Sequence, residues 1–476
     1  MRSYDYNFLV IGGGPAGIAA ARAATALGAK VALVERAKLG GDCLHTGCIP
    51  SKALLRTARF LAQSRRADAL GLKSPAVDFD FTEVMTRLRR VIGDRAESDS
   101  AERLLSVGIA HFEGSARLLS RHEVQVNDRL LRVGSILLAT GAHPSIPPIP
   151  GLESMEPRTS DKIWDLESLP RRLLVLGGGV IGCELAQAFA RLGSAVTLVE
   201  RNPRVLPRED EEVSLALQDS LGSAGVKFYL STQAQSFRRD GDRKLLRCEP
   251  GEDDIEFDEV LVALGRRPNT EGLGLEKAGV RLRANGTIEV DAYMRTSAPG
   301  IFACGDVAGP LQFAHFASLA GEAAARGALL APAKRKVDLS VFPWAVYTDP
   351  EVARVGMDET EAKASGKSYE VFRADFRDSD RAVVEEEAKG FVKVLKGSGG
   401  TILGATIVGP SAGELIHEWA LAMSAGLPIQ AVASLTHAYP TLSEINREVA
   451  LSAAEGEKKA SALSQAWFRL RRNLGF

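Results

Sequence analysis

Two stretches of the chain repeat one pattern of apolar and polar positions. Residues 8–36 and residues 173–201 each begin with an apolar run, pass through a glycine-rich turn into an alanine-rich stretch, and end in a second apolar run before a glutamate. Apolar runs on either side of a segment with helical spacing predict a strand, a helix and a second strand. Because the two stretches align without a gap, the chain contains a duplicated strand–helix–strand unit.

The turn of each copy carries the spacing G-x-G-x-x-G. The first glycine permits a tight turn, the second lets the backbone approach a pyrophosphate, and the third lets the helix pack closely on its strand. The pyrophosphate meets free N–H groups at the start of a helix, and the closing glutamate accepts hydrogen bonds from a ribose. A turn without a ligand could explain one copy but explains two poorly. The predicted dinucleotide sites are Gly12, Gly14, Gly17 and Glu35 in the first copy and Gly177, Gly179, Gly182 and Glu200 in the second.

A second pair of similar segments, residues 136–144 and residues 260–268, follows the two units. Each is an apolar run that ends in a glycine turn, as expected for the closing strand of a dinucleotide-binding domain. We expect Thr140, Gly141 and Gly265, which lie in these turns, to contribute to the two cofactor sites.

Cys43 and Cys48 closely follow the first unit, with four residues between them. From Ser51 onward apolar residues recur at helical intervals, and thiols near a helix N-terminus have depressed pKa values. Lys52 adds a positive charge nearby. Since no second cysteine pair or histidine cluster completes four zinc ligands, we interpret the two cysteines as a redox pair and expect no metal site. The other cysteines stand singly and are expected to be small buried residues: Cys183, Cys248 and Cys304.

The numbers of charged side chains do not point to a particular partner. With 59 basic and 60 acidic side chains, the chain shows no sign of a nucleic acid partner. The first residues lack the basic and apolar segments of a secretion signal, and no stretch approaches the roughly 18 apolar residues of a membrane span. Five cysteines in 476 residues do not suggest a secreted disulfide framework. We therefore expect a cytoplasmic enzyme with about three domains.

Further motifs extend along nearly the whole chain. They are GGDCLHTGCIPSK at residues 40–52, ATGAHPSIPPIPG at residues 139–151, IFACGDVAGPLQFAHFA at residues 301–317 and HAYPTLSE at residues 437–444. With these motifs the chain resembles the class I pyridine nucleotide-disulfide oxidoreductases, the family of dihydrolipoamide dehydrogenase, glutathione reductase and mercuric reductase. The resemblance implies an FAD-dependent enzyme that acts on a sulfur group, with NAD or NADP as electron acceptor or donor.

The resemblance also implies which residues hold the flavin. It places FAD in the first dinucleotide site, with Gly114 on the adenine side. Asp306 is then expected to bond the ribityl chain, and Ala314 to lie beside the flavin ring. Lys52 is expected to approach flavin N5.

The remaining roles concern electron transfer. By resemblance Cys48 faces the flavin, Cys43 exchanges with the substrate, and Glu184 lies near the nicotinamide ring. The carboxylate of Glu200 suits the free 2′-hydroxyl of NAD and repels the 2′-phosphate of NADP. NAD is therefore expected, while the neighbouring Arg201 leaves NADP open.

One position departs from the family pattern. Disulfide-reducing members carry a catalytic histidine before Pro-Thr in the last motif and a glutamate five residues later, whereas Tyr439 and Glu444 stand here. Imidazole exchanges a proton near neutral pH, but a phenol with a pKa of about 10 mainly donates hydrogen bonds. His437 could replace the missing base or could be a packed structural residue.

Three functions remain open on these residues. The first is an FAD-dependent oxidoreductase resembling dihydrolipoamide dehydrogenase, which exchanges electrons between NAD(H) and a small-molecule or protein-bound disulfide or dithiol. The second is a reductase of a metal ion or another acceptor that resembles mercuric reductase. The third, from another class, is an NAD-sensing flavoprotein that docks on a partner without turnover.

The expected fold is α/β, with two Rossmann-like dinucleotide-binding domains, for FAD and NAD, and a C-terminal α+β dimerisation domain. By resemblance, Tyr439 and Glu444 reach the other subunit's cysteines in a homodimer. Apolar and basic residues at helical spacing in the C-terminal tail predict a helix that docks on its own dimer or makes a weak membrane or partner contact. The expected boundaries are 1–150 and 271–340 for the FAD domain, 151–270 for the NAD domain, 341–455 for the dimerisation domain and 456–476 for the tail.

Overall fold

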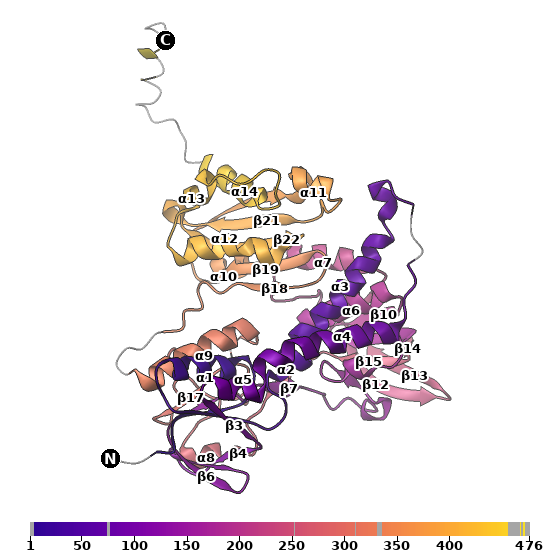
Figure 1. The fold of residues 1–476 in the computed structure, drawn as a ribbon. Coiled ribbons are helices and arrows are strands. Elements are labelled where there is room, and N and C mark those ends of the chain that lie inside the picture. Colours follow the sequence, from indigo (N-terminus) through magenta and orange to yellow (C-terminus); the bar gives the residue numbers. More distant parts are fainter. Residues whose placement is uncertain are drawn as a thin grey trace. The chain divides into compact units, whose positions relative to one another are not determined.

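The computed structural model describes residues 4–73, 77–251, 253–309, 311–330 and 336–455, together with Trp467, Leu470 and Arg471. The predicted tail helix otherwise lies outside these residues. Contacts divide the chain into two compact units, which are described separately (Figure 1). Within the described ranges, no helix is both long and apolar enough to cross a membrane. Unit 1 comprises residues 1–66, 74–205 and 221–338, and unit 2 comprises residues 67–73, 206–220 and 339–476.

The first sheet of unit 1 contains the first predicted strand–helix–strand unit. Its parallel strands run in the order β3-β2-β1-β6-β17, and β5 and β4 extend β6 in antiparallel fashion. The bounds are β1 (Tyr6–Ile11), β2 (Val31–Glu35), β3 (Ile109–Glu113), β4 (Ala116–Leu118), β5 (Glu123–Val126), β6 (Arg129–Leu138) and β17 (Ile301–Ala303).

The second sheet repeats the order of the first four parallel strands. All its strands are parallel and run in the order β11-β10-β9-β15-β8, so the second copy supplies the central strands as the first copy does. The duplication seen in the sequence is therefore a duplication of the Rossmann-like strand order. The bounds are β8 (Arg158–Thr159), β9 (Arg172–Leu176), β10 (Ala195–Val199), β11 (Lys227–Tyr229) and β15 (Glu259–Val262).

Helices from distant parts of the sequence pack together in unit 1. α1 (Pro15–Ala26) packs on α9 (Ala314–Leu329), and α3 (Cys48–Ser64) packs on α4 (Phe81–Ala96) and α6 (Val180–Leu192) (Figure 1). The α3 helix begins three residues before the predicted start at Ser51, because Pro50 is tolerated in a first turn where its missing N–H is not needed. The shorter helices are α2 (Gly41–His45), α5 (Ala101–Ser106) and α8 (Leu275–Ala278).

The two closing segments noticed in the sequence pair with each other. β7 (Ala142–Pro144) and β16 (Arg266–Pro268) form a two-stranded antiparallel ribbon. Thr140 Oγ1 donates to the carbonyl of Asn269 at 2.7 Å, and Asn269 Nδ2 donates to the carbonyl of Thr140 at 2.8 Å. The turns after the two closing strands are thus joined directly. A separate antiparallel sheet contains β12 (Gln233–Asp240), β13 (Arg243–Glu249) and β14 (Asp254–Phe257).

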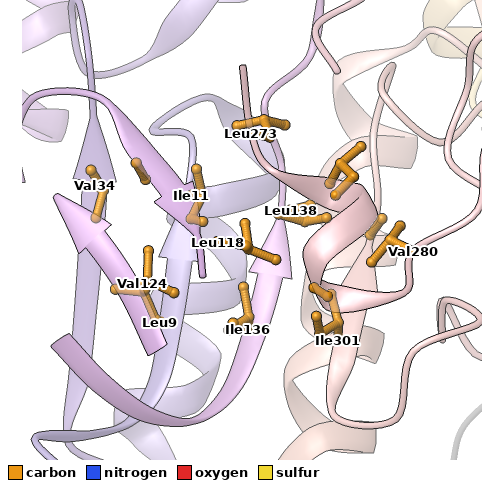
Figure 2. Packing of buried hydrophobic residues seen from close by; sticks show 14 of the residues in the cluster. Leu9, Ile11, Val34, Leu118, Val124, Ile136, Leu138, Leu273, Val280 and Ile301 are labelled. Atoms are coloured by element: carbon orange, nitrogen blue, oxygen red, sulfur yellow. The ribbon is translucent and has the colours of Figure 1, made fainter. Parts of the chain in front are cut away.

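The core beside the first sheet collects aliphatic side chains from both ends of unit 1. Figure 2 shows Ile136 and Leu138 of β6 between Leu9 of β1 and the later residues Val280 and Ile301, all in one apolar cluster. Each of the five is at most 7% exposed. The segment after residue 270 therefore completes the core that the first 150 residues begin.

Unit 2 is an antiparallel sheet packed with helices, in the order β18-β19-β22-β21-β20. Trp419 is fully buried among the apolar side chains of this core and donates its indole N–H to Asn446 Oδ1 at 2.8 Å. The strands are β18 (Trp344–Val346), β19 (Glu351–Gly356), β20 (Glu370–Asp375), β21 (Phe391–Lys396) and β22 (Ile402–Gly409). The helices are α7 (Glu211–Ser223), whose last three residues are assigned to unit 1, and α10 (Glu359–Ala364), α11 (Asp380–Val384), α12 (Ala412–Ser424), α13 (Ile429–Ser434) and α14 (Glu444–Glu455).

Arg354 lies at the centre of an ionic cluster in unit 2. Its side chain is 5% exposed and lies 4.1 Å from the ring centre of Trp344. Its guanidinium is 3.0 Å from Glu209, 3.2 Å from Asp358 and 2.7 Å from Glu361. Burial raises the pKa of Glu209, against the opposing influence of Arg354. The cation therefore compensates two carboxylates with little access to water, Glu209 and Asp358, whose side chains are 8% and 5% exposed, whereas Glu361 is half exposed.

Candidate functional site

The two glycine turns have the same local geometry. Gly12 has φ +112° and Gly177 has φ +105°, backbone conformations that residues other than glycine rarely adopt. A Cβ on Gly12 would lie 2.2 Å from the carbonyl oxygen of Ala139, and one on Gly177 would lie 2.5 Å from that of Ala263. Each turn therefore passes under the closing strand of its own half, where only glycine fits.

The third glycine of each motif brings the helix against the turn. A Cβ on Gly17 would lie 1.8 Å from the carbonyl oxygen of Gly12, and one on Gly182 would lie 1.9 Å from that of Gly177. Such distances exclude any side chain without movement of the backbone. The close helix packing predicted from the spacing is thus present in both copies.

The starts of α1 and α6 are suited to an anion. Gly14 and Gly179 are the N-cap residues, and no side chain among the described residues caps either helix. A Cβ on Gly179 would meet nothing within 4 Å, and one on Gly14 would meet only the Cα of Gly41 at 4.0 Å. The backbone N–H groups at these ends remain approachable, so both turns fit the pyrophosphate of a dinucleotide.

The closing glutamates bond to their own glycine turns. Glu35 accepts from the N–H of Gly13 at 2.6 Å, and Glu200 accepts from the N–H of Gly178 at 2.6 Å. Glu200 is 7% exposed and also accepts from the backbone N–H and the side-chain amide of Asn202, at 2.8 and 2.5 Å. Asn202 was not predicted from the sequence, although its place two residues after the glutamate was a usable signal.

The structure brings Cys43 and Cys48 together as partly buried free thiols. Cys43 lies in α2, and Cys48 is the first residue of α3. A side-chain hydrogen bond from Cys43 lowers the pKa of the Cys48 thiol from 9.0 to about 7, with a smaller lowering by the charge of Lys52. The same bond, together with burial, raises the pKa of Cys43. Cys48 is therefore the thiol that ionises first.

The structure also joins two predicted residues from different motifs. Lys52 Nζ donates to both carboxylate oxygens of Glu184, at 2.8 and 3.0 Å. The Glu184 side chain is 3% exposed, so the pair is partly removed from water. This contact places α3, the helix that begins at Cys48, against α6, the helix of the second glycine motif.

The other predicted flavin residues lie in unit 1. Gly114 has φ +143°, and a Cβ there would lie 2.3 Å from side-chain atoms of Asn127. Asp306 follows β17 by three residues, and burial raises its pKa while Arg266 opposes that rise. Ala314 is the first residue of α9. Arg266 was not anticipated from the sequence.

The predicted substrate-side residues lie in unit 2. The phenol of Tyr439 donates to Asp380 Oδ2 at 2.8 Å, and this bond raises the pKa of Tyr439. Glu444 begins α14 and accepts from the N–H of Thr441 at 3.2 Å. Asp380 was not predicted from the sequence, because it lies 59 residues from Tyr439 in the chain.

His437, considered as a substitute base, is engaged elsewhere. Its side chain is 6% exposed, and its Nε2 lies 3.0 Å from Glu418 Oε1. This arrangement is that of a packed structural residue. Elsewhere in the described ranges, no three His, Cys, Asp or Glu side chains gather as a group that could hold a metal ion.

Comparisons with known proteins agree with the geometry. Residues 6–321 match the family model described as pyridine nucleotide-disulphide oxidoreductase, and residues 342–450 match the dimerisation domain of that family. The chain is 40% identical to a dihydrolipoyl dehydrogenase of Thermus scotoductus over 93% of this chain and 96% of that protein. It is 34% identical to a mercuric reductase of Staphylococcus aureus over 97% of this chain and 84% of that protein.

A solved structure extends the likeness to the fold. The HOCl-induced flavoprotein disulfide reductase RclA from Escherichia coli superposes with a TM-score of 0.84 at 29% identity, covering 94% of this chain and 99% of that one. RclA is also known as a Cu(II) complex. The α/β architecture with a C-terminal dimerisation domain is thereby confirmed, and the dimerisation domain supports a homodimer.

Proposed function

Because this chain belongs to the pyridine nucleotide-disulphide oxidoreductases, we propose that it is an NADH-driven reductase that delivers electrons through FAD and the Cys43–Cys48 dithiol to an acceptor. FAD-dependent oxidoreductase activity on sulfur groups is the activity of the family. The direction and the acceptor are the finer points proposed here, with residues 1–150 and 271–340 binding FAD and residues 151–270 binding NAD.

The fit of the glycine turns supports two bound nucleotides. FAD, when bound, accepts a hydride from the nicotinamide and supplies two electrons to the disulfide. We assign it to the first turn, because the dithiol segment directly follows that copy. Glu200 supports NAD over NADP, since a buried carboxylate suits a ribose diol and disfavours a 2′-phosphate. A cytoplasmic location fits a dithiol that must be reduced in each turnover.

In this proposal Cys48 is the inner thiol, which faces the flavin, and Cys43 is the outer thiol, which meets the acceptor. Cys48 holds the thiolate, because its pKa is lowered to about 7 by the hydrogen bond from Cys43. Cys43 keeps its proton until it attacks an acceptor. Lys52 holds a positive charge one helical turn from Cys48, and Glu184 fixes the position of that charge.

The single observation that carries the direction is the state of Tyr439. Oxidising a dihydrolipoyl group requires a base that removes a thiol proton, and a phenol that already donates to a carboxylate cannot serve as that base near neutral pH. His437 does not supply it either, because it pairs with Glu418 inside unit 2. Reduction of a disulfide by the dithiol instead needs an acid that protonates the leaving thiolate, and reduction of a soft metal ion needs neither group.

Dihydrolipoyl dehydrogenation is the second candidate. The 40% identity to a dihydrolipoyl dehydrogenase favours it, as does the complete dithiol. The two candidates differ in which direction is fast, so they can be separated with the same purified holoenzyme.

We expect Tyr439→His to raise dihydrolipoamide oxidation with NAD⁺ by about a hundredfold, the lower range for general base catalysis. Steady-state rates would be measured in both directions, with lipoamide and Cu(II) as acceptors for NADH. Tyr439→Phe is the matched control, because it keeps the ring and removes the hydroxyl. A wild-type enzyme that oxidises dihydrolipoamide as fast as it reduces lipoamide, together with no gain in Tyr439→His, would contradict the proposal.

A further inference from the structure

Arg266 lies between two carboxylates that come from distant parts of unit 1. Its Nη2 donates to Asp42 Oδ2, and its Nε is 3.5 Å from Asp306 Oδ2. The Arg266 side chain is 15% exposed, whereas that of Asp42 is 53% exposed. One guanidinium thus contacts both the residue before Cys43 and a residue expected at the flavin.

The position of Arg266 is set by the two-stranded ribbon. Arg266 is the first residue of β16, and its Nη2 also donates to the carbonyl of Ala142 in β7 at 2.6 Å. The bonds between Thr140 and Asn269 hold the base of this ribbon. The guanidinium is therefore anchored on a paired element rather than extended from a loose loop.

The α2 helix that carries Cys43 depends on contacts of this kind. It has only five residues, and so short a helix is not stable without contacts to its surroundings. One contact is the hydrogen bond from the N–H of Gly40 to the carbonyl of Gly13, at 2.8 Å. The Asp42–Arg266 ion pair is a charged contact from within the helix itself, one residue before the outer thiol.

We propose that Asp42 and Arg266 are positioning residues for the redox pair, and that their ion pair stabilises the dithiol geometry in which Cys43 donates to Cys48. The inference rests on the proposed function of the dithiol. Cys48 is held by a long helix, α3, so the outer thiol is the member whose position the ion pair can change. Losing the pair removes support from the dithiol form and shifts the equilibrium toward the disulfide.

The test measures that equilibrium in the FAD-bound enzyme. Wild type, Asp42→Asn, Arg266→Gln and the double variant are equilibrated without oxygen in mixtures of reduced and oxidised dithiothreitol. Two electrons and two protons pass from dithiothreitol to the protein disulfide, which gives two protein thiols and the cyclic oxidised reagent. Alkylation and peptide mass then give the fraction of protein with both thiols free.

Each single variant is expected to shift the equilibrium constant toward the disulfide by about threefold to tenfold, as for one partly exposed charged hydrogen bond. The double variant is expected to shift it no further than a single one, because both substitutions remove the same contact. Glu289→Gln is the matched control, since it breaks the exposed ion pair with Arg281 in the same unit. An unchanged constant in Asp42→Asn, or additive shifts in the double variant, would overturn the inference.

Two further readouts separate this inference from a general loss of structure and from the proposed function. Flavin absorbance and the thermal midpoint of Asp42→Asn are expected to match those of Glu289→Gln. If NADH fails to expose Cys43 and Cys48 to alkylation in the wild type, the proposed function fails together with the inference. If NADH exposes both thiols but the variants keep the wild-type constant, only the positioning role fails.

Discussion

Removal of the Cys43 thiol is predicted to raise the pKa of Cys48 by two units or more. The hydrogen bond from Cys43 is the largest cause that lowers the Cys48 pKa from 9.0 to about 7, while burial and the charge of Glu184 act in the opposite direction. Without the bond, only the charge of Lys52 and a smaller backbone hydrogen bond oppose those two effects. A shift of two units corresponds to about 2.7 kcal/mol between the two protonation states. At pH 7 the thiolate fraction of Cys48 then falls from about one half to about one hundredth.

The assay is the pH dependence of Cys48 alkylation by iodoacetamide, followed by peptide mass. Cys43→Ala is compared with Cys43→Ser, whose hydroxyl can still donate, so the serine variant is expected to have an intermediate midpoint. Cys183 and Cys304 serve as internal references, because burial raises their pKa values and slows their reaction. A midpoint near 7 that persists in Cys43→Ala would refute the assignment of the inner thiolate to this hydrogen bond.

Three further predictions concern the nucleotide sites and the ionic core. Gly17→Ala is expected to lose FAD, whereas Gly182→Ala is expected to keep FAD but no longer to be reduced by NADH. Flavin absorbance during anaerobic NADH titration distinguishes the two variants. The same absorbance change in both variants would contradict two separate nucleotide sites. Glu200→Gln is expected to narrow the ratio of kcat/KM for NADH over NADPH by about tenfold, and a wild-type preference for NADPH would contradict the assignment. Arg354→Met is expected to destabilise the protein by about 3 to 5 kcal/mol in urea unfolding, because it leaves a buried charge uncompensated. Because burial raises the pKa of Glu209, the neutral form of this carboxyl is favoured in the fold. The loss of stability caused by Arg354→Met is therefore expected to grow as pH rises and Glu209 ionises, and to shrink as pH falls. A loss of stability that does not depend on pH would contradict the role of Glu209.

The sequence allowed the glycine turns to be predicted well, because their requirements are local. Positive φ at Gly12 and a close helix approach at Gly17 follow from spacing within a single turn. The pairing of β7 with β16 could not be predicted, although both segments were recognised as similar, because similarity of two strands does not imply that they bond to each other. The start of α3 was placed at Ser51 rather than Cys48, since a proline near a boundary fits either side of it.

The contacts of charged side chains were the least predictable part of the site. Arg266 and Asp42 are 224 residues apart, and no periodicity links them. Asp380 reaches Tyr439 across 59 residues, yet it decides whether the phenol donates or accepts. Such pairs depend on which elements the fold brings together, whereas the motifs record only what each element needs by itself.

The ion pair between Lys52 and Glu184 shows how two separate motif assignments become one site. From resemblance, Lys52 was expected near the flavin and Glu184 near the nicotinamide, each in its own half of the duplicated chain. Their contact at 2.8 Å requires those two positions to adjoin, because α3 packs directly on α6. Hydride transfer requires the two bound rings to adjoin, and a lysine and a glutamate that each face one ring then occupy neighbouring positions. The pairing therefore supports both assignments more strongly than either motif does alone.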